Sequence, residues 1–349
     1  MKILFLPNWK VHQLEIDNNI FQAPDKHIRG EPYWFFKYFS NDCHVDIIDC
    51  QKNSWISFLE KKVNFYILQG VKAFFKSGKY DLVISHGAQS GLVYSLLKTI
   101  TLRKSPPHLI FDIGAMNGAR KNFLENLFIA FALKSRPYII CHSKVVIDYY
   151  ESTYKSLISR SCFIPFGVDI DDFSPEGTNQ EGEYILSFGY AKRDYETLFK
   201  AWHRIKTDKK LRVIGYKKEI SFSNIEIIDK VSIEELKKQI SNALFVIIPL
   251  PVFNYSYGQM SFLQSMSLGK TVIVTKTPSS VDYLKDGEGS LYVNPYDAID
   301  MQEKIRYLLE NKEALNNSNK RARQYVIKYF SEKVMAEKIF KFIQSNLGI

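Results

Sequence analysis

The chain has 349 residues, of which 46% are hydrophobic and 24% are charged, a balance that excludes a disordered or fibrous protein and allows two globular domains. The formal net charge of +10 favours anionic partners such as phosphorylated substrates, an acidic membrane surface or nucleic acid. Because the sequence has no arginine-rich tract or recognised nucleic-acid motif, it predicts no nucleic-acid partner.

The first half of the chain contains short apolar runs that end in polar or glycine-containing turns, which predicts a parallel α/β sheet. The predicted strands are residues 2–6, 45–48, 81–85, 109–113 and 138–142. Helical spacing of apolar residues predicts helices at 31–39, 54–79 and 121–134. The polar stretch 8–30 is expected to be a long loop.

Polar side chains follow two of these strands. His86 comes directly after the strand 81–85, Asp112 lies near the end of the strand 109–113, and Asn117 and Arg120 follow it. Ligands of open parallel sheets bind beyond the carboxyl ends of the strands, so these residues are candidates for a ligand site. The alternatives are structural: a satisfied loop histidine, a turn-capping aspartate and a surface arginine.

The segment 54–79 combines aromatic residues with a basic charge excess. Residues 60–79 contain five lysines and one glutamate. The interleaved aromatic residues include Trp55, Phe58, Phe65, Phe74 and Phe75. One interpretation is a helix that lies on an anionic membrane surface; the other is a helix packed on the sheet with a solvated basic face. Periodicity does not decide between them.

The second half repeats the alternation of strands and helices. Strands are predicted at 184–188, 211–215, 225–228, 245–250 and 271–275. A helix capped by Ser232 is predicted to begin at residue 233, and others are predicted at 196–206, 298–310, 313–329 and 332–346.

Two turns in this half favour an anion. Gly189 ends the strand 184–188 and is followed by Lys192 and Arg193, and arginine binds phosphate oxygens in bidentate fashion. The alternative for Arg193 is a solvated residue at a helix start. The second turn contains Gly258 and precedes a short amphipathic helix, whose N-terminal N–H groups form a natural phosphate site. The candidate N–H groups are those of Gly258, Gln259, Met260 and Ser261.

The stretch QSMSLGKTV at 264–272 resembles the nucleotide-sugar half of GT-B glycosyltransferases, especially retaining family-four (group 1) enzymes. Residues 164–169 (IPFGVD) resemble the interdomain segment of that family, and residues 189–195 (GYAKRDY) resemble its diphosphate loop. This sequence departs from the family pattern at Ser256 and Gln264, where two acidic residues are usual, and at Tyr190, where an arginine is usual.

The resemblance implies an α/β fold of two Rossmann-like domains facing a cleft. Residues 1–168 would bind the acceptor, residues 169–330 would bind the nucleotide sugar, and a helix within 331–349 would return to the N-terminal domain. Gly30 and Glu31 resemble the acceptor loop of the family, and Asn117 and Arg120 are placed on the same side. The implied donor-binding residues are Gly189, Lys192, Arg193, the residues 256–261 and Gln264, whose amide is predicted to reach the ribose.

The implied reaction is sugar transfer from a nucleoside diphosphate sugar, UDP favoured over GDP, to a glycan or lipid-linked acceptor in cell-surface polysaccharide or glycolipid assembly, with retention. An alternative is an inverting enzyme that uses Asp112 or His86 as the catalytic base. A third is a catalytically degenerate GT-B protein with a binding or regulatory role, since both usual carboxylates are replaced. The donor sugar, the linkage and the oligomeric state are not predicted.

Several features concern compartment and cofactors. The four cysteines, Cys43, Cys50, Cys141 and Cys162, lack the spacing of a disulfide framework or a metal site, which favours a reducing cytoplasm. The N-terminus is not a signal peptide, and no apolar run reaches the roughly 20 residues that span a bilayer. We therefore expect a cytoplasmic protein, peripheral on the inner face of the cell membrane, with no metal and no cofactor beyond the sugar-nucleotide substrate.

Overall fold

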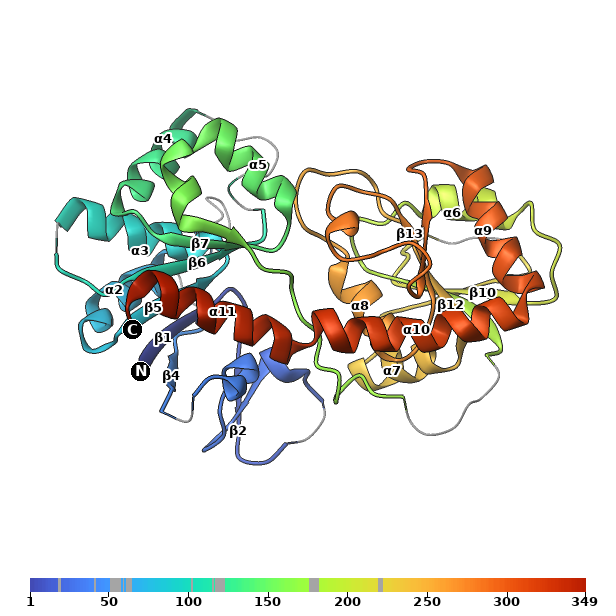
Figure 1. Cartoon of the computed structure of the whole chain (residues 1–349), viewed down its shortest axis with the longest axis horizontal. Helices are drawn as coiled ribbons and strands as arrows, with labels where there is room; N and C mark the ends of the chain where they lie inside the picture. Colours follow the sequence, from blue (N-terminus) through green and yellow to red (C-terminus); the bar gives the residue numbers. More distant parts are fainter. Residues whose placement is uncertain are drawn as a thin grey trace. The chain divides into compact units, whose positions relative to one another are not determined.

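The computed structural model describes residues 1–17, 20–40, 42–50, 58, 60, 65–101, 103–114, 116, 123–175, 182–218 and 222–349 (Figure 1). It divides into two compact units. The first unit contains Met1–Pro165, Asn254–Ser256 and Met335–Ile349, and the second contains Phe166–Phe253 and Tyr257–Val334. The functional domain boundaries after residues 168 and 330 stay predictions.

The first unit is built on a six-stranded parallel sheet of order β4-β1-β5-β6-β7-β8. Its strands are β1 (Lys2–Pro7), β4 (His44–Ile47), β5 (Leu82–His86), β6 (His108–Asp112), β7 (Tyr138–Cys141) and β8 (Ser161–Phe163). Every residue of β5 and β6 is buried, as expected for strands that are covered on both faces. Their near-continuous apolar sequences explain why the strand predictions here were correct to within about one residue.

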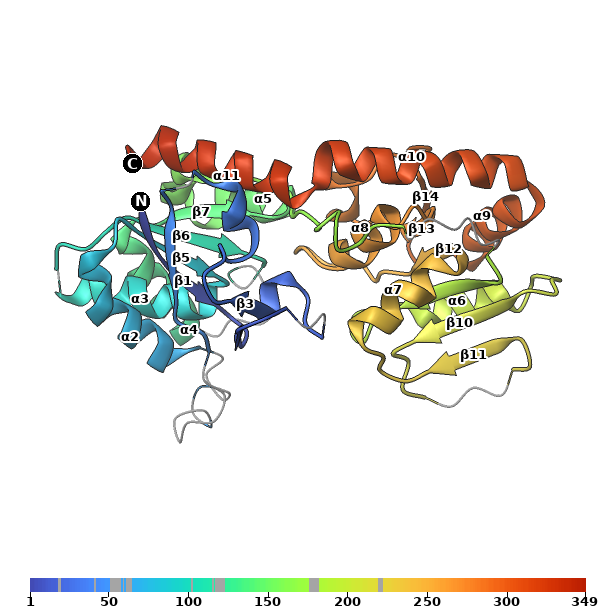
Figure 2. The same cartoon turned by 90° about the horizontal axis from the view of Figure 1, so that it is seen from below.

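Helices cover both faces of this sheet (Figure 2). On one face lie α2 (Ile67–Lys76), α3 (Ala88–Thr101), α4 (Phe123–Ala132) and α5 (Lys144–Thr153), with the short helices η3 (Ser77–Lys79), η4 (Leu133–Ser135) and η5 (Lys155–Arg160). The core on this side joins Leu92 of α3 and Ile129 of α4 to Ile110 of β6. Part of α11 (Glu332–Leu347) belongs to the same unit, where the ring of Phe340 lies 5.1 Å from that of Phe39.

Two predictions near the N-terminus were wrong in detail. The expected loop 8–30 contains a small parallel sheet of β2 (His12–Leu14) and β3 (Lys26–Ile28), with η1 (Ala23–Asp25) between them. The helix expected at 31–39 is the short 3₁₀ helix η2 (Trp34–Tyr38). The consecutive side chains 34–36 are all buried, and an α-helix with one apolar face cannot bury three neighbours in a row.

The second unit repeats the architecture with a six-stranded parallel sheet of order β11-β10-β9-β12-β13-β14. Its strands are β9 (Tyr184–Phe188), β10 (Lys210–Ile214), β11 (Ile225–Ile228), β12 (Ala243–Ile248), β13 (Val272–Thr275) and β14 (Ser290–Val293). Its helices are α6 (Tyr195–Trp202), α7 (Ile233–Ser241), α8 (Gln259–Ser267), η6 (Ser280–Asp282), α9 (Ala298–Glu310) and α10 (Lys312–Phe330). Ser232 caps α7 as predicted, since its hydroxyl accepts the N–H of Glu235.

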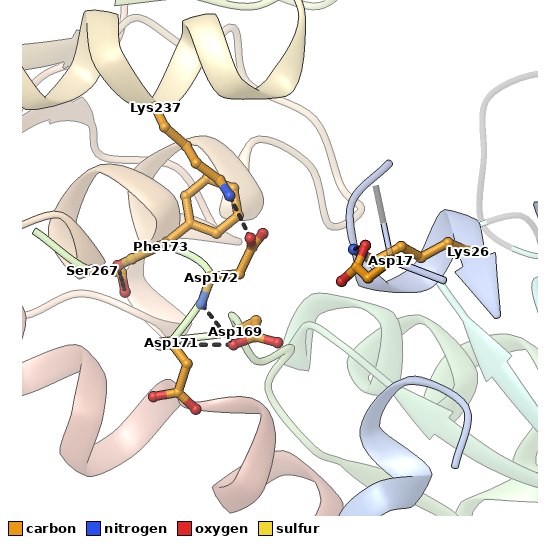
Figure 3. Close-up of polar contacts among 8 residues, drawn as sticks. All are labelled: Asp17, Lys26, Asp169, Asp171, Asp172, Phe173, Lys237 and Ser267. Carbon is orange, nitrogen blue, oxygen red and sulfur yellow. Dashed lines mark hydrogen bonds and ion pairs between the residues drawn. The ribbon is translucent and has the colours of Figure 1, made fainter. Parts of the chain in front are cut away.

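Residues 166–175 of the second unit are fastened by polar contacts (Figure 3). The carboxylate of Asp169 accepts the N–H groups of the two aspartates 171 and 172. Lys237 of α7 pairs with Asp172, and Arg323 of α10 donates to the carbonyl of Phe173. The other ion pair drawn, Lys26 with Asp17, belongs to the small sheet of the first unit. The segment is thus bound to two helices of its own unit.

Within the part of the chain that the structure describes, we find no helix with the length and apolar character needed to cross a membrane.

Candidate functional site

The carboxyl ends of the central strands of the second unit lead into glycine-containing loops. Gly189 follows β9 with φ +143°, and Gly215 follows β10 with φ +92°. A Cβ on Gly215 would lie 2.5 Å from the ring of Tyr190, so the tyrosine packs directly on this glycine. The Tyr190 hydroxyl also accepts the N–H of Val231. The tyrosine that replaces the family arginine therefore ties together the loops after β9, β10 and β11.

Gly258 sets the start of α8. Its φ of +77° is left-handed, and an added Cβ would lie 2.8 Å from Leu250, so both backbone conformation and space favour glycine. No side chain caps the helix, which leaves its first N–H groups at the surface of the loop. The N–H of Ser261 donates to the carbonyl of Gly258 at 3.0 Å. Contrary to the sequence-based expectation, this group is thus engaged within the helix, while the N–H groups of Gly258, Gln259 and Met260 precede the first helical bond.

The side chain of Gln259 adds an acceptor at the same place. Its Oε1 is buried and has no hydrogen-bond partner among the described residues. Buried polar atoms are nearly always paired, so this oxygen is suited to receive a donor from a ligand. Gln264, one turn further along α8, is also buried, with 6% of its surface exposed.

Arg193 joins the loop after β9 to α8. Its Nε donates to the carbonyl of Phe188 at 3.1 Å, and its Nη1 donates to the carbonyls of residues 191 and 192. Its Nη2 donates to the hydroxyl of Ser261 at 2.7 Å. Burial lowers the pKa of Arg193, yet a guanidinium stays protonated in proteins. Arg193 is therefore a fixed cation that fastens the loop after β9 to the first turn of α8.

The other residues that were predicted to bind the donor have different surroundings from one another. Lys192 is exposed, and its Nζ lies 5.8 Å from the ring centroid of Phe253, which contacts the buried Tyr257 edge to face. Ser256 groups with the first unit, where its hydroxyl donates to the carbonyl of His142 at 3.3 Å. The Ser256 hydroxyl thus anchors this stretch of chain to the residue that follows β7.

In the first unit, the strand ends are filled by aromatic side chains. The ring centroid of His86 lies 4.7 Å from that of Trp9 and 5.6 Å from that of Trp34. Burial lowers the pKa of His86 to about 3, with a smaller contribution from His142. Burial likewise lowers the pKa of His142 to about 4, and this ring contacts the carbonyl of Ile164. Both imidazoles are neutral and weakly basic near neutral pH, which disfavours His86 as a catalytic base.

The contacts of Asp112 indicate a structural role. One carboxylate oxygen accepts the N–H of Gly114 at 3.0 Å, and the other accepts the hydroxyl of Tyr150 on α5. The side chain is fully buried and so caps the turn after β6 while anchoring α5, as the structural alternative proposed.

Among the acceptor-side residues, Gly30 and Glu31 are exposed in the turn after β3, where Gly30 has φ +86°. Asn117 and Arg120 lie outside the described residues. His142 was not a sequence-based candidate, although it follows β7 just as His86 ends β5, and the same strand-end argument finds it. Trp9 and Trp34 gave no such signal, because loop aromatics carry no periodicity.

The described residues contain no group of three or more His, Cys, Asp or Glu side chains arranged to hold a metal ion.

Comparison with known proteins agrees with this architecture. Residues 183–311 match the family described as glycosyl transferases group 1. A relative, an uncharacterized glycosyltransferase of Methanocaldococcus jannaschii, is 26% identical over 274 residues, which is 75% of each chain.

Solved structures share the fold at low sequence identity. HepE of Anabaena in complex with UDP is 12% identical, with a TM-score of 0.67 over 99% of this chain and 100% of that one. Sucrose-phosphate synthase of Thermosynechococcus elongatus is 15% identical, with a TM-score of 0.70 over 99% of each chain. The predicted GT-B fold is confirmed.

Proposed function

We propose that this chain, which is a group 1 glycosyltransferase with the GT-B fold, transfers a sugar from a UDP-sugar to a glycan or lipid-linked acceptor with retention at the anomeric carbon. The donor class is supported by the HepE structures, which were solved with UDP and with UDP-glucose. Assembly of a cell-surface polysaccharide or glycolipid, in the cytoplasm at the inner face of the cell membrane, is part of the same proposal.

The observation that carries the proposal is the first turn of α8. Unpaired N–H groups and the helix dipole favour a diphosphate there. The guanidinium of Arg193 is fixed to this turn through Ser261, and Gln259 contributes a buried acceptor. In the proposed reaction the bond from the anomeric carbon to the diphosphate breaks, an acceptor hydroxyl oxygen bonds to that carbon, and its proton passes to the leaving diphosphate. The N–H groups and Arg193 stabilise the charge that develops on the leaving oxygen, while the Gln259 oxygen accepts a hydrogen bond from the donor. The same role makes a metal ion or further cofactor unnecessary.

Retention and inversion make different demands on the first unit. An inverting enzyme needs a base that removes the acceptor proton, and neither Asp112, which holds Tyr150, nor the weakly basic His86 suits that task. We therefore favour retention. Nuclear magnetic resonance of the first-formed product decides, since the anomeric configuration of the donor must be kept.

Calorimetric titration with UDP and GDP tests the donor site. Arg193→Ala removes a charge-assisted contact of about 1.5–3 kcal/mol, so the affinity for UDP should fall at least about tenfold. Arg193→Lys should fail as well, because an ammonium cannot span the three carbonyls and the Ser261 hydroxyl. The control is Arg306→Ala, which removes an exposed arginine of α9 in the same unit.

Two results would contradict the proposal. One is a UDP affinity that is the same in the wild type, Arg193→Ala and Arg306→Ala proteins. The other is nucleotide binding without transfer or hydrolysis of any sugar from a panel of donors, which would favour the degenerate binding protein instead.

A further inference from the structure

Helices α2, α3 and α4 of the first unit end at the same edge of the sheet. Each runs directly into the next strand, β5, β6 or β7, and these strands are parallel neighbours. The helices lie side by side in the order α2, α3, α4 (Figures 1 and 2). Their C-terminal ends therefore form one continuous rim at the amino edge of the sheet, which we call the helix-end rim.

Direct contacts connect the parts of this rim. The hydroxyl of Thr99, near the end of α3, lies 3.5 Å from the carbonyl of Ala132 at the end of α4. The guanidinium of Arg103, just after α3, lies 5.5 Å from the ring centroid of Phe74 on α2. The three helix ends are thus adjacent at the level of side chains.

Large apolar side chains are exposed along the rim. Phe75 is 69% exposed, Ile100 is 60% exposed and Phe131 is 38% exposed. Phe74, next to Phe75, is buried against the sheet. One side of α2 therefore packs on the sheet, and the side chain of Phe75 on its other side is exposed.

The surrounding charges are almost all positive. Segments 65–81, 88–104 and 123–136 contain eight lysines and arginines and two acidic residues, Asp81 and Glu125. Lys76 and Lys134 are exposed, and the Nζ of Lys134 lies 4.9 Å from the ring centroid of Phe131. Cations near helix C-termini complement the helix dipole, but that effect does not account for three exposed apolar side chains among them.

We propose that the helix-end rim docks on an anionic membrane surface, with Phe75, Ile100 and Phe131 entering the interface and the flanking cations facing lipid phosphates. Apolar residues ringed by lysine and arginine are the composition of interfacial membrane anchors. A second copy of this chain is a poor occupant, because a two-fold contact would place the cationic rim against itself. The inference rests on the proposed function only in its placement at the inner face of the cell membrane; the rim lies at the amino edge of the sheet, opposite the carboxyl edge where ligands of such sheets bind.

Co-sedimentation with vesicles tests the docking. The full chain should bind equimolar phosphatidylcholine–phosphatidylglycerol vesicles at low salt and dissociate at high salt, since surface charge acts only within the Debye length. Lys76→Ala with Lys134→Ala should weaken binding about 25-fold, at about fivefold for each cation. Phe75→Ser with Phe131→Ser should weaken it about tenfold while keeping the net charge.

The matched control is Lys320→Ala with Arg321→Ala, which removes two exposed cations from α10 of the second unit and should leave vesicle binding unchanged. Circular dichroism of each variant reports on folding, and UDP titration reports on the donor site. Equal binding to pure phosphatidylcholine vesicles, or equal losses in the control, would overturn the docking while leaving the donor proposal intact. Self-association that is abolished by the Phe75→Ser and Phe131→Ser changes would assign the rim to a second copy and overturn it too.

Discussion

Both units contain a six-stranded parallel sheet, but the carboxyl edges of the two sheets are filled in opposite ways. In the first unit the strand ends are occupied by the unit's own side chains: His86 lies among tryptophan and phenylalanine rings, and Asp112 is held by Tyr150. In the second unit the start of α8 at Gly258 has no side-chain cap, and Arg193 joins the loop after β9 to this helix. One edge is closed by packing, whereas the other presents backbone N–H groups.

The comparison shows what each edge can do. An edge closed by buried aromatic rings and neutral histidines stabilises its own unit, and those side chains offer no charged group to a ligand. An edge that exposes N–H groups at a helix start offers charge stabilisation, which suits a diphosphate. The parallel strands alone would have assigned both carboxyl edges the same role, so the groups that follow the strands decide.

We expect the largest difference between the two units at acid pH, where the first unit should be the less stable one. His86, His108 and His142 are buried in the first unit, and burial lowers the pKa of each, to about 3 for His86 and about 4 for His142. The second unit has a single histidine, His203, which is exposed. The unfolded chain, with histidine pKa values near 6.5, binds protons first. The first unit should therefore lose about 1.4 kcal/mol of stability per pH unit for each buried histidine below about pH 6.5.

Hydrogen exchange followed by mass spectrometry at pH values from neutral to acidic measures this loss unit by unit. His86→Phe, which keeps an aromatic ring and removes one titration, should reduce the pH slope of the first unit by one proton. Loss of protection in both units together, or an unchanged slope in the variant, would show that these histidines do not set the acid response.

Asp112→Ala should be the most damaging of the single substitutions considered. It leaves the hydroxyl of Tyr150 and the N–H of Gly114 buried without an acceptor, at about 3 kcal/mol together. Urea unfolding measures the loss, and UDP affinity should not change. The control is Asp148→Ala, an exposed carboxylate on α5. An Asp112→Asn protein with wild-type stability and no transferase activity would instead support the inverting mechanism.

Two glycines of the second unit give a finer test of the carboxyl edge that presents backbone N–H groups. Gly258 and Gly287 both have left-handed φ values, +77° and +82°, but an added Cβ meets Leu250 at Gly258 and nothing within 4 Å at Gly287. Alanine at either position should lower stability by roughly 1 kcal/mol. Only Gly258→Ala should also weaken UDP binding, about tenfold by calorimetry, because it displaces the first turn of α8. Equal affinities for the two variants would argue against a diphosphate at this turn.

The sequence predicted the framework better than the site. Apolar runs predicted both bounds of the strand Tyr184–Phe188. Ser232 and Gly258 predicted where α7 and α8 begin. The roles of Arg193 and Asp112 depend on partners 68 and 38 positions away, and no local pattern encodes such contacts. The 3₁₀ helix after Pro32 was missed for a related reason, since tertiary burial of three neighbouring aromatic residues overrode helix propensity.

The first unit contains residues from both ends of the chain, so it can be completed only at the end of synthesis. Residues 335–349 belong to this unit, where the hydroxyl of Tyr138 donates to the carbonyl of Asn346 and Phe342 contacts the Tyr138 ring. A ribosome adds these residues only after the entire second unit has been translated. Until then the part of the sheet that α11 covers stays exposed, so a chaperone that binds nascent chains would meet this part first.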